Sequence, residues 1–153
     1  MPINEALEKG LQITRLLQAL HSAGWVWRDC KPRNLILSDE NRLRPVDFEG
    51  ACSIGVVERM PWGTVGYAPP EALIERRAAY RVPEDLYALG ATLHHLLSGR
   101  VPGESAPPPI GGLRKGIPPR VREVIHALLD SDLRSRPSTS TVLNTLLSFA
   151  PDR

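Results

Sequence analysis

The stretch Trp27-Arg28-Asp29-Cys30-Lys31-Pro32-Arg33-Asn34-Leu35 places an acid, a lysine and an amide in one short segment. A carboxylate can orient an attacking hydroxyl, a lysine can neutralise a phosphoryl group, and an amide oxygen can hold Mg²⁺. The residue types and their spacing therefore indicate phosphoryl-transfer chemistry. Taken alone, the pattern also fits a capped turn between a helix and a strand.

The composition is that of an ordinary globular domain. The chain has 153 residues, of which 42% are hydrophobic and 24% charged, enough to bury a core. The formal net charge is +2 and aromatic residues are few, so we expect no nucleic acid and no membrane surface as partners. No apolar stretch is long enough to span a bilayer, and the N-terminus lacks a signal-peptide pattern. Cys30 and Cys52 have neither metal-ligand nor redox spacing, which favours reduced thiols in a cytoplasmic protein.

Apolar periodicity predicts helices over residues 5–23, 84–98, 119–129 and 138–150. The helix over 84–98 is nearly all apolar and is expected to be the buried axis of the domain. Two short apolar runs, 35–37 and one ending at 46, flank a turn and predict a β-hairpin. Residues 99–119 are rich in proline and glycine and predict a loop with little regular structure. The fold class is therefore mainly α with a small β-hairpin.

In this order, the elements and motifs resemble the C-terminal lobe of eukaryotic-type protein kinases over the whole chain, residues 1–153. The matching parts are a catalytic loop (27–34), an Asp-Phe-Gly-like metal motif (47–49), an activation segment (47–71), a central helix (84–98) and C-terminal helices (119–150). Each motif alone has a plainer interpretation, such as a strand-end turn or a helix start. Their shared order and approximate spacing favour the kinase-like fold.

The resemblance implies a role for each matching residue and implies ATP and Mg²⁺ as cofactors. Asp29 would orient or deprotonate the substrate hydroxyl, and Lys31 would contact the γ-phosphate. Asn34 and Asp47 would bind Mg²⁺, and Ile36 would form the lower face of the adenine pocket. Structural support is implied for Trp27, Arg28, Phe48, Glu71, Asp85 and Arg136.

Three pairings are implied within that supporting group. Asp85 would hold the backbone of the catalytic loop, and Arg136 would pair with Glu71. Trp27 stands where the family usually has histidine and would pack against Phe48.

Two further features concern regulation. Arg28 could receive a phosphate carried by one of the few hydroxyls of the activation segment, chiefly Ser53, Thr64 and Tyr67. Glu49 stands in place of the motif glycine, which restricts the backbone and adds a carboxylate near the metal site.

No glycine-rich phosphate loop and no strand lysine of the family precede the catalytic loop in these residues. We therefore expect the N-lobe that clamps ATP to be missing from this chain. Phosphoryl transfer to a Ser/Thr hydroxyl of a protein substrate would need an N-lobe, supplied by a longer protein or by a partner chain over the exposed upper face. The alternatives are a pseudokinase-like binding module without chemistry and a truncated remnant.

A competing enzyme class is the small-molecule phosphotransferases related to aminoglycoside kinases, which carry a similar Asp, Asn and metal Asp. Lys31 and the pairing of Pro69-Pro70-Glu71 with Arg136 favour the protein-kinase branch. Within that branch, the motifs resemble bacterial kinases, including the kinase domains of class III lanthipeptide synthetases.

Overall fold

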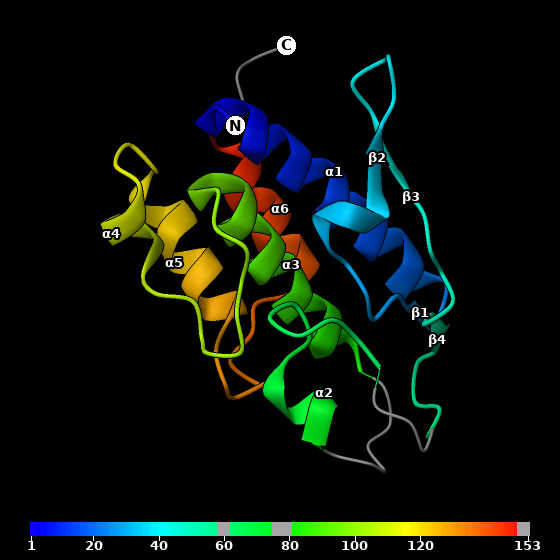
Figure 1. Ribbon diagram of the computed structural model, residues 1–153. Helices are drawn as coiled ribbons and strands as arrows, with labels where there is room; N and C mark the ends of the chain where they lie inside the picture. Colours follow the sequence, from blue (N-terminus) through cyan, green and yellow to red (C-terminus); the bar gives the residue numbers. More distant parts are fainter. Residues whose placement is uncertain (58–61, 75–80, 150–153) are drawn as a thin grey trace.

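The computed structural model describes residues 1–57, 62–74 and 81–149, without the side chains of residues 73 and 74. In this part of the chain, helices pack around one central helix, and two small antiparallel sheets lie to one side (Figure 1). The helices are α1 (Ile3–Ser22), α2 (Pro70–Ile74), α3 (Val82–Ser98), α4 (Ile110–Leu113), α5 (Pro119–Leu128) and α6 (Thr139–Leu147). The strands are β1 (Trp25–Val26), β2 (Leu35–Leu37), β3 (Leu43–Pro45) and β4 (Cys52–Ser53), with a 3₁₀ turn over Pro32–Asn34.

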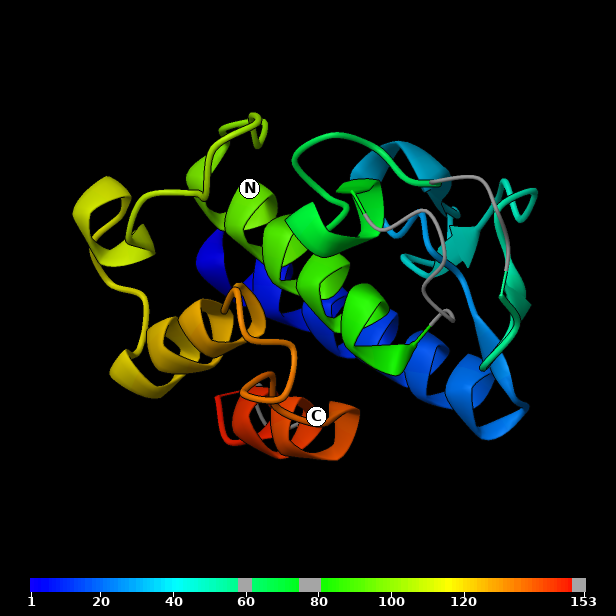
Figure 2. The ribbon, with the colours of Figure 1, turned by 90° about the horizontal axis from the view of Figure 1, so that it is seen from below.

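Helix α3 is the axis of the fold, and most of its residues are buried. It packs on α1 along one side and on α5 along the other, while α6 contacts both α1 and α5 (Figure 2). Pro83 stands in its first turn, where the missing N–H costs nothing, and Gly99 ends it in a left-handed conformation with φ of 72°. The loop over residues 27–34 lies against this buried helix, which it contacts at Asp85 and Thr92.

The hairpin β2–β3 is held down by α1. Its strands pair Leu35 with Pro45, and its turn contains Asn41, whose φ is 60°. Buried Lys9 of α1 donates from Nζ to the Asn41 carbonyl (2.7 Å) and to Asn41 Oδ1 (2.5 Å). Figure 1 shows the hairpin rising beside α1, with its tip away from the remaining helices.

The helix-rich fold with small antiparallel sheets agrees with the expected class. The helices predicted over 5–23, 84–98 and 119–129 form as α1, α3 and α5, and the predicted hairpin forms as β2–β3. The helix predicted over 138–150 forms as α6, although residue 150 lies outside the described residues, as do residues 58–61 of the segment 47–71.

Helix α2, helix α4 and the second sheet were not predicted from the sequence. The loop predicted over 99–119 contains the single-turn helix α4, which starts directly after Pro109. The second sheet pairs β1 with β4, so Trp25 faces Ser53 and Val26 faces Cys52. Such a two-residue pairing between distant segments has no local signature.

Among the described residues, no helix combines the length and hydropathy that crossing a bilayer requires.

Candidate active site

Helix α3 fixes the backbone of the loop over residues 27–34. Asp85, which is fully buried, accepts the backbone N–H of Trp27 at Oδ2 (2.8 Å) and that of Arg28 at Oδ1 (2.7 Å). Further along the helix, Thr92 donates from Oγ1 to the Cys30 carbonyl (2.9 Å). Arg28 has a left-handed φ of 71°, which these neighbouring bonds stabilise. The loop is therefore tied to a rigid element on both sides of Asp29.

The buried carboxylate of Asp85 is stabilised by His21 and by the N-terminus of α3. His21, in the last turn of α1, donates from Nε2 to Asp85 Oδ2 at 2.9 Å. Asp85 also stands in the first turn of α3, where the helix dipole favours a negative charge. A buried carboxylate with three donors can act as a stable anchor.

The Asp29 carboxylate is the centre of a polar network. Its Oδ2 accepts from Lys31 Nζ (2.6 Å) and from Asn34 Nδ2 (2.9 Å), and its Oδ1 accepts from Thr64 Oγ1 (2.7 Å). Lys31 Nζ also donates to Thr64 Oγ1 at 2.6 Å. Asp29 and Asn34 are buried, while Lys31 and Thr64 are half-buried. Each side chain is thus oriented by at least one other member, with a cation beside the carboxylate.

Asn34 and Asp47 come together at the base of the hairpin. The Asn34 carbonyl accepts from Val46 N–H (2.9 Å), so Asp47 follows directly beside Asn34. Asn34 uses its Nδ2 for the Asp29 network, which leaves the amide oxygen Oδ1 outside those bonds. Asp47 is exposed, and its carbonyl accepts from Trp27 Nε1 (3.0 Å).

These two oxygen donors fit Mg²⁺. Magnesium prefers carboxylate and carbonyl oxygens, and in phosphate-transfer sites it takes one or two protein ligands together with substrate phosphates and water. Among the described residues, no group of three His, Cys, Asp or Glu side chains could hold a metal on its own. The donor set suits an ion shared with a bound phosphate and does not suit a structural metal.

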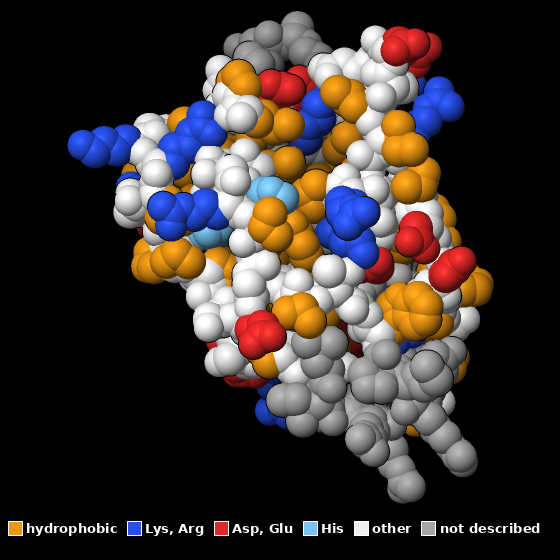
Figure 3. Space-filling view, viewed as in Figure 1, with side chains coloured by type: hydrophobic (Ala, Val, Ile, Leu, Met, Phe, Trp, Pro, Cys, Tyr) orange, Lys and Arg blue, Asp and Glu red, His pale blue; other side chains and the backbone are white. Residues whose placement is uncertain are grey.

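Two aromatic rings stack beside the candidate metal ligand Asp47. The rings of Trp27 and Phe48 stack with centroids 5.4 Å apart and an interplanar angle of 25°. Trp27 is buried, but Phe48 is 42% exposed and Ile36 on β2 is 54% exposed. Figure 3 shows hydrophobic side chains on the surface of the hairpin side of the molecule. The stack joins the loop to the segment after Asp47, and Phe48 and Ile36 keep exposed apolar surface.

A second ion pair lies at the other end of the site. Arg136 Nη1 is 2.7 Å from Glu71 Oε1, and the Arg136 side chain is fully buried. The same guanidinium donates to the carbonyls of Asp130 (2.9 Å) and Pro83 (2.8 Å) and lies 5.1 Å from the ring of Tyr87. The pair fastens the start of α2 to the first turn of α3.

Comparison with known proteins decides the family. The family model described as protein kinase domain matches residues 2–147, nearly the whole chain. The chain belongs to the protein kinase family. Members of this family generally use ATP and Mg²⁺ and act on proteins, and relatives such as PknA are named as serine/threonine-protein kinases.

Three relatives illustrate the match. Rhodopsin kinase GRK7 from Sus scrofa is 36% identical over 104 residues, covering 67% of this chain and 19% of that protein. G protein-coupled receptor kinase 2 from Drosophila melanogaster is 38% identical over 88 residues, covering 56% of this chain and 12% of that protein. Serine/threonine-protein kinase PknA from Mycobacterium tuberculosis is 31% identical over 146 residues, covering 84% of this chain and 33% of that protein. The kinase chain spans at most a third of the length of these relatives.

Thr64 was not predicted as a member of the Asp29 network, and the burial of the nearby Glu84 was not predicted either. Thr64 entered the sequence analysis only as a candidate for phosphorylation, yet it touches both Asp29 and Lys31. Glu84 is 6% exposed in the first turn of α3, and burial raises its pKa to about 7, against the opposing effect of Arg81 and Arg28. No local signal marks Thr64, because Asp29 and Lys31 lie far from it in sequence, whereas Glu84 has Arg81 as an i,i+3 neighbour at 3.9 Å.

Arg28, expected as a possible phosphate receptor, is buried beside Gly50 and Trp62. It is 6% exposed, donates from Nη1 to the Gly50 carbonyl (3.2 Å) and lies 6.0 Å from the ring centroid of Trp62. The Cys30 thiol, two residues further on, is fully buried, and burial raises its pKa well above the usual value. Neither side chain faces the solvent beside Asp29.

Proposed function

We propose that residues 1–153 form the C-terminal lobe of a protein kinase domain and carry the catalytic residues for ATP- and Mg²⁺-dependent phosphoryl transfer to a Ser/Thr hydroxyl of a protein. The observation that carries the proposal is the network in which Asp29 accepts from Lys31, Asn34 and Thr64. To position a hydroxyl against a phosphoryl group, a site needs a carboxylate held in one orientation beside a lysine.

In this proposal, each polar side chain has one task. Asp29 orients the substrate hydroxyl and accepts its proton, and Lys31 neutralises charge on the transferred phosphoryl group. Asn34 and Asp47 hold Mg²⁺ through Oδ atoms. The ion, when bound, supplies charge neutralisation across the phosphates. Asp85 keeps the loop backbone in the shape that these tasks require.

The proposal assigns the ATP-clamping elements to an N-lobe outside residues 1–153, on the same polypeptide or on a partner chain. Support comes from the exposed apolar side chains of Ile36, Leu37 and Phe48, which lie on or just after the hairpin that Asn34 and Asp47 flank. An apolar surface of this kind marks an interface. Ile36 would meet the adenine ring from below, with the N-lobe above it.

The finer assignments belong to the same proposal. No disulfide joins Cys30 and Cys52, as suits a cytoplasmic protein, the compartment that we assign. The relation to the kinase domains of class III lanthipeptide synthetases stays a prediction from the motifs.

A second candidate function is a binding module that performs no chemistry. The exposed apolar face and the substitution of Glu49 for the motif glycine favour it. In that case the same surface would bind a partner protein, and Asp29 would serve only to hold its loop together.

The experiment is a phosphoryl-transfer assay with labelled ATP, Mg²⁺ and a general protein substrate. It uses the native protein, purified from the cells that produce it by means of an affinity tag on this chain. We expect Asp29→Ala to lower kcat by about 10²–10⁴-fold, the usual contribution of a positioned proton acceptor. Asp47→Ala should raise the Mg²⁺ concentration that half-maximal activity requires. Asp39→Ala, on the exposed hairpin turn, is the matched control and should change neither value.

Intact mass of the same sample shows whether the ATP-clamping elements lie on this polypeptide or on a co-isolated chain. Equal transfer by the Asp29→Ala variant would contradict the proposed role of Asp29. A native protein that neither transfers phosphate nor binds Mg²⁺–ATP would favour the binding module.

A further inference from the structure

The indole of Trp62 occupies the space directly over the backbone of Gly50. A Cβ atom added at Gly50 would overlap the indole ring, and Gly50 itself is buried. The Arg28 guanidinium completes the contact, since it donates to the Gly50 carbonyl (3.2 Å) and lies 6.0 Å from the Trp62 ring centroid. Three separate segments of the chain therefore meet at one aromatic side chain.

The position between Trp62 and Thr64 accepts only glycine. Gly63 has a φ of 130°, a conformation that residues with a side chain rarely adopt, and a Cβ there would lie 2.6 Å from the Cβ of Ala68. The Arg28 carbonyl lies on the same side, 3.5 Å from that position. Trp62 and Thr64 are joined through this one closely packed residue, so we expect a displacement of Trp62 to shift Thr64, whose Oγ1 is 2.7 Å from Asp29 Oδ1.

We propose that Trp62 is a positioning residue for phosphoryl transfer, which wedges against Gly50 and Arg28 and so holds Thr64 on Asp29 and Lys31. This inference rests on the proposed function for its kinetic consequence, but its structural content is independent of activity. It also assigns Arg28 to this aromatic contact in place of a phosphate, so the segment would be held by unmodified side chains.

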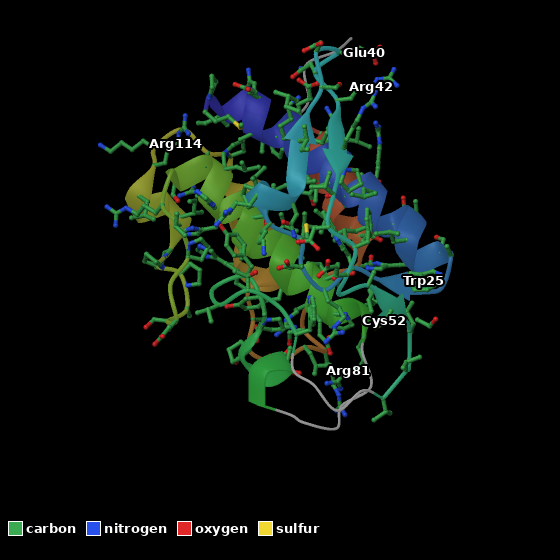
Figure 4. The ribbon with its side chains drawn as sticks, turned by 45° about the vertical axis from the view of Figure 1, so that its right-hand side comes forward. Trp25, Glu40, Arg42, Cys52, Arg81 and Arg114 are labelled. Atoms are coloured by element: carbon green, nitrogen blue, oxygen red, sulfur yellow. The ribbon has the colours of Figure 1, made fainter. Side chains whose placement is uncertain are left out.

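The chain offers a pair of variants that remove the contact from its two sides. Trp62→Ala removes the indole, and Gly50→Ala displaces it because the added Cβ would occupy the same space. Gly50 lacks a positive φ, so alanine causes no backbone strain there. Trp62→Phe keeps an aromatic ring and is the conservative variant. Trp25→Ala is the matched control, because Trp25 is a half-exposed tryptophan on β1, facing β4 (Figure 4).

The first readout is hydrogen exchange at the amides of Tyr67 and Ala68, both of which donate to the Thr64 carbonyl (2.9 and 2.8 Å). We expect Trp62→Ala and Gly50→Ala to speed exchange at both amides about 10-fold or more, while Trp62→Phe and Trp25→Ala leave it unchanged. Dephosphorylation of the unchanged protein, verified by mass, should also leave it unchanged. Unaltered exchange in both Trp62→Ala and Gly50→Ala would overturn the proposal, as would protection lost on dephosphorylation.

The second readout is steady-state kinetics on the native protein. We expect kcat to fall roughly 10- to 100-fold in Trp62→Ala and Gly50→Ala, the scale of a small misplacement of catalytic groups, with KM for ATP nearly constant. Trp62→Phe should recover most of kcat. Full kcat in Trp62→Ala would overturn the positioning role. If the unchanged protein itself transfers no phosphate, the proposed function fails, and the exchange experiment still decides whether Trp62 holds Thr64.

Discussion

At the scale of single residues, the buried carboxyl of Glu84 couples folding to pH. Burial raises its pKa from 4.5 to about 7, so the folded protein binds this proton more tightly than the unfolded chain does. The stability that Glu84 contributes is therefore complete below about pH 4.5 and is lost as the pH rises through about 7. The nearby charges of Arg81 and Arg28 reduce this loss but do not cancel it.

We predict that Glu84→Gln flattens this dependence. Relative to the unchanged protein, the variant should gain unfolding free energy as the pH rises from 5 to 8, by at most about 3 kcal/mol. Urea denaturation at several pH values measures the free energy of unfolding of both proteins. Glu123→Gln, on an exposed position of α5, is the control and should follow the unchanged protein. Parallel pH profiles for the Glu84→Gln variant and the unchanged protein would contradict the prediction.

The limits of sequence-based prediction at this scale follow from distance along the chain. Asp29, Lys31 and Asn34 lie within six consecutive positions, so local spacing alone brings them together. Thr64 reaches Asp29 across 35 positions, and that contact depends on the path of the whole intervening segment. Hydrogen-bonding side chains such as Thr64 give no hint in the sequence of the partner that they will meet.

At the scale of elements, the hairpin β2–β3 depends on α1 for its position. Lys9 bonds the hairpin turn at Asn41, and Gln12 Oε1 accepts from Leu43 N–H (2.7 Å). A two-stranded hairpin is marginal in water without such support. Because Asn34 and Asp47 flank the hairpin, its anchoring also sets the separation of the candidate metal ligands.

Lys9→Met should therefore loosen the hairpin while keeping the apolar length of the side chain. Hydrogen bonds from a charged group are worth about 1.5–3 kcal/mol, so we expect about 10- to 100-fold faster amide exchange along β2 and β3. The amides of α3 should not change. Lys115→Met, at an exposed position before α5, is the control. Equal exchange in the Lys9→Met variant and the unchanged protein would show that the hairpin stands without this anchor.

The helices and strands differ in how well they could be predicted from the sequence. Helices α1, α3 and α5 carry long periodic apolar patterns, because each buries one face or nearly all of its surface. The β1–β4 sheet has two residues per strand, and the single turn α4 has four residues, so neither can carry a period. Tertiary packing forms these short elements, and only the folded chain reveals them.

At the scale of the whole molecule, three apolar side chains of the hairpin side are exposed: Ile36 (54%) and Leu37 (49%), on opposite faces of β2, and Phe48 (42%). We predict that the purified 153-residue chain binds a hydrophobic dye and self-associates through these side chains. The double substitution Ile36→Ser/Leu37→Ser should reduce both effects. Dye fluorescence and light scattering across a concentration series measure them.

The matched control is Val101→Ser, since Val101 is 72% exposed on the loop between α3 and α4. This variant should bind as much dye as the unchanged chain. A monodisperse, dye-silent unchanged chain would argue against an interface on the hairpin side, and with it against a lobe or partner that covers the candidate site.

Burial of the Cys30 thiol between Asp29 and Lys31 has a consequence for covalent chemistry. Alkylating reagents attack the thiolate, and this sulfur is both fully covered and kept protonated by its raised pKa. An electrophilic inhibitor designed against a cysteine next to Asp29 would therefore find no nucleophile in the folded protein. Modification of Cys30 would instead record how often the loop detaches from Thr92 and α3, which makes this sulfur an internal reporter of opening at the site.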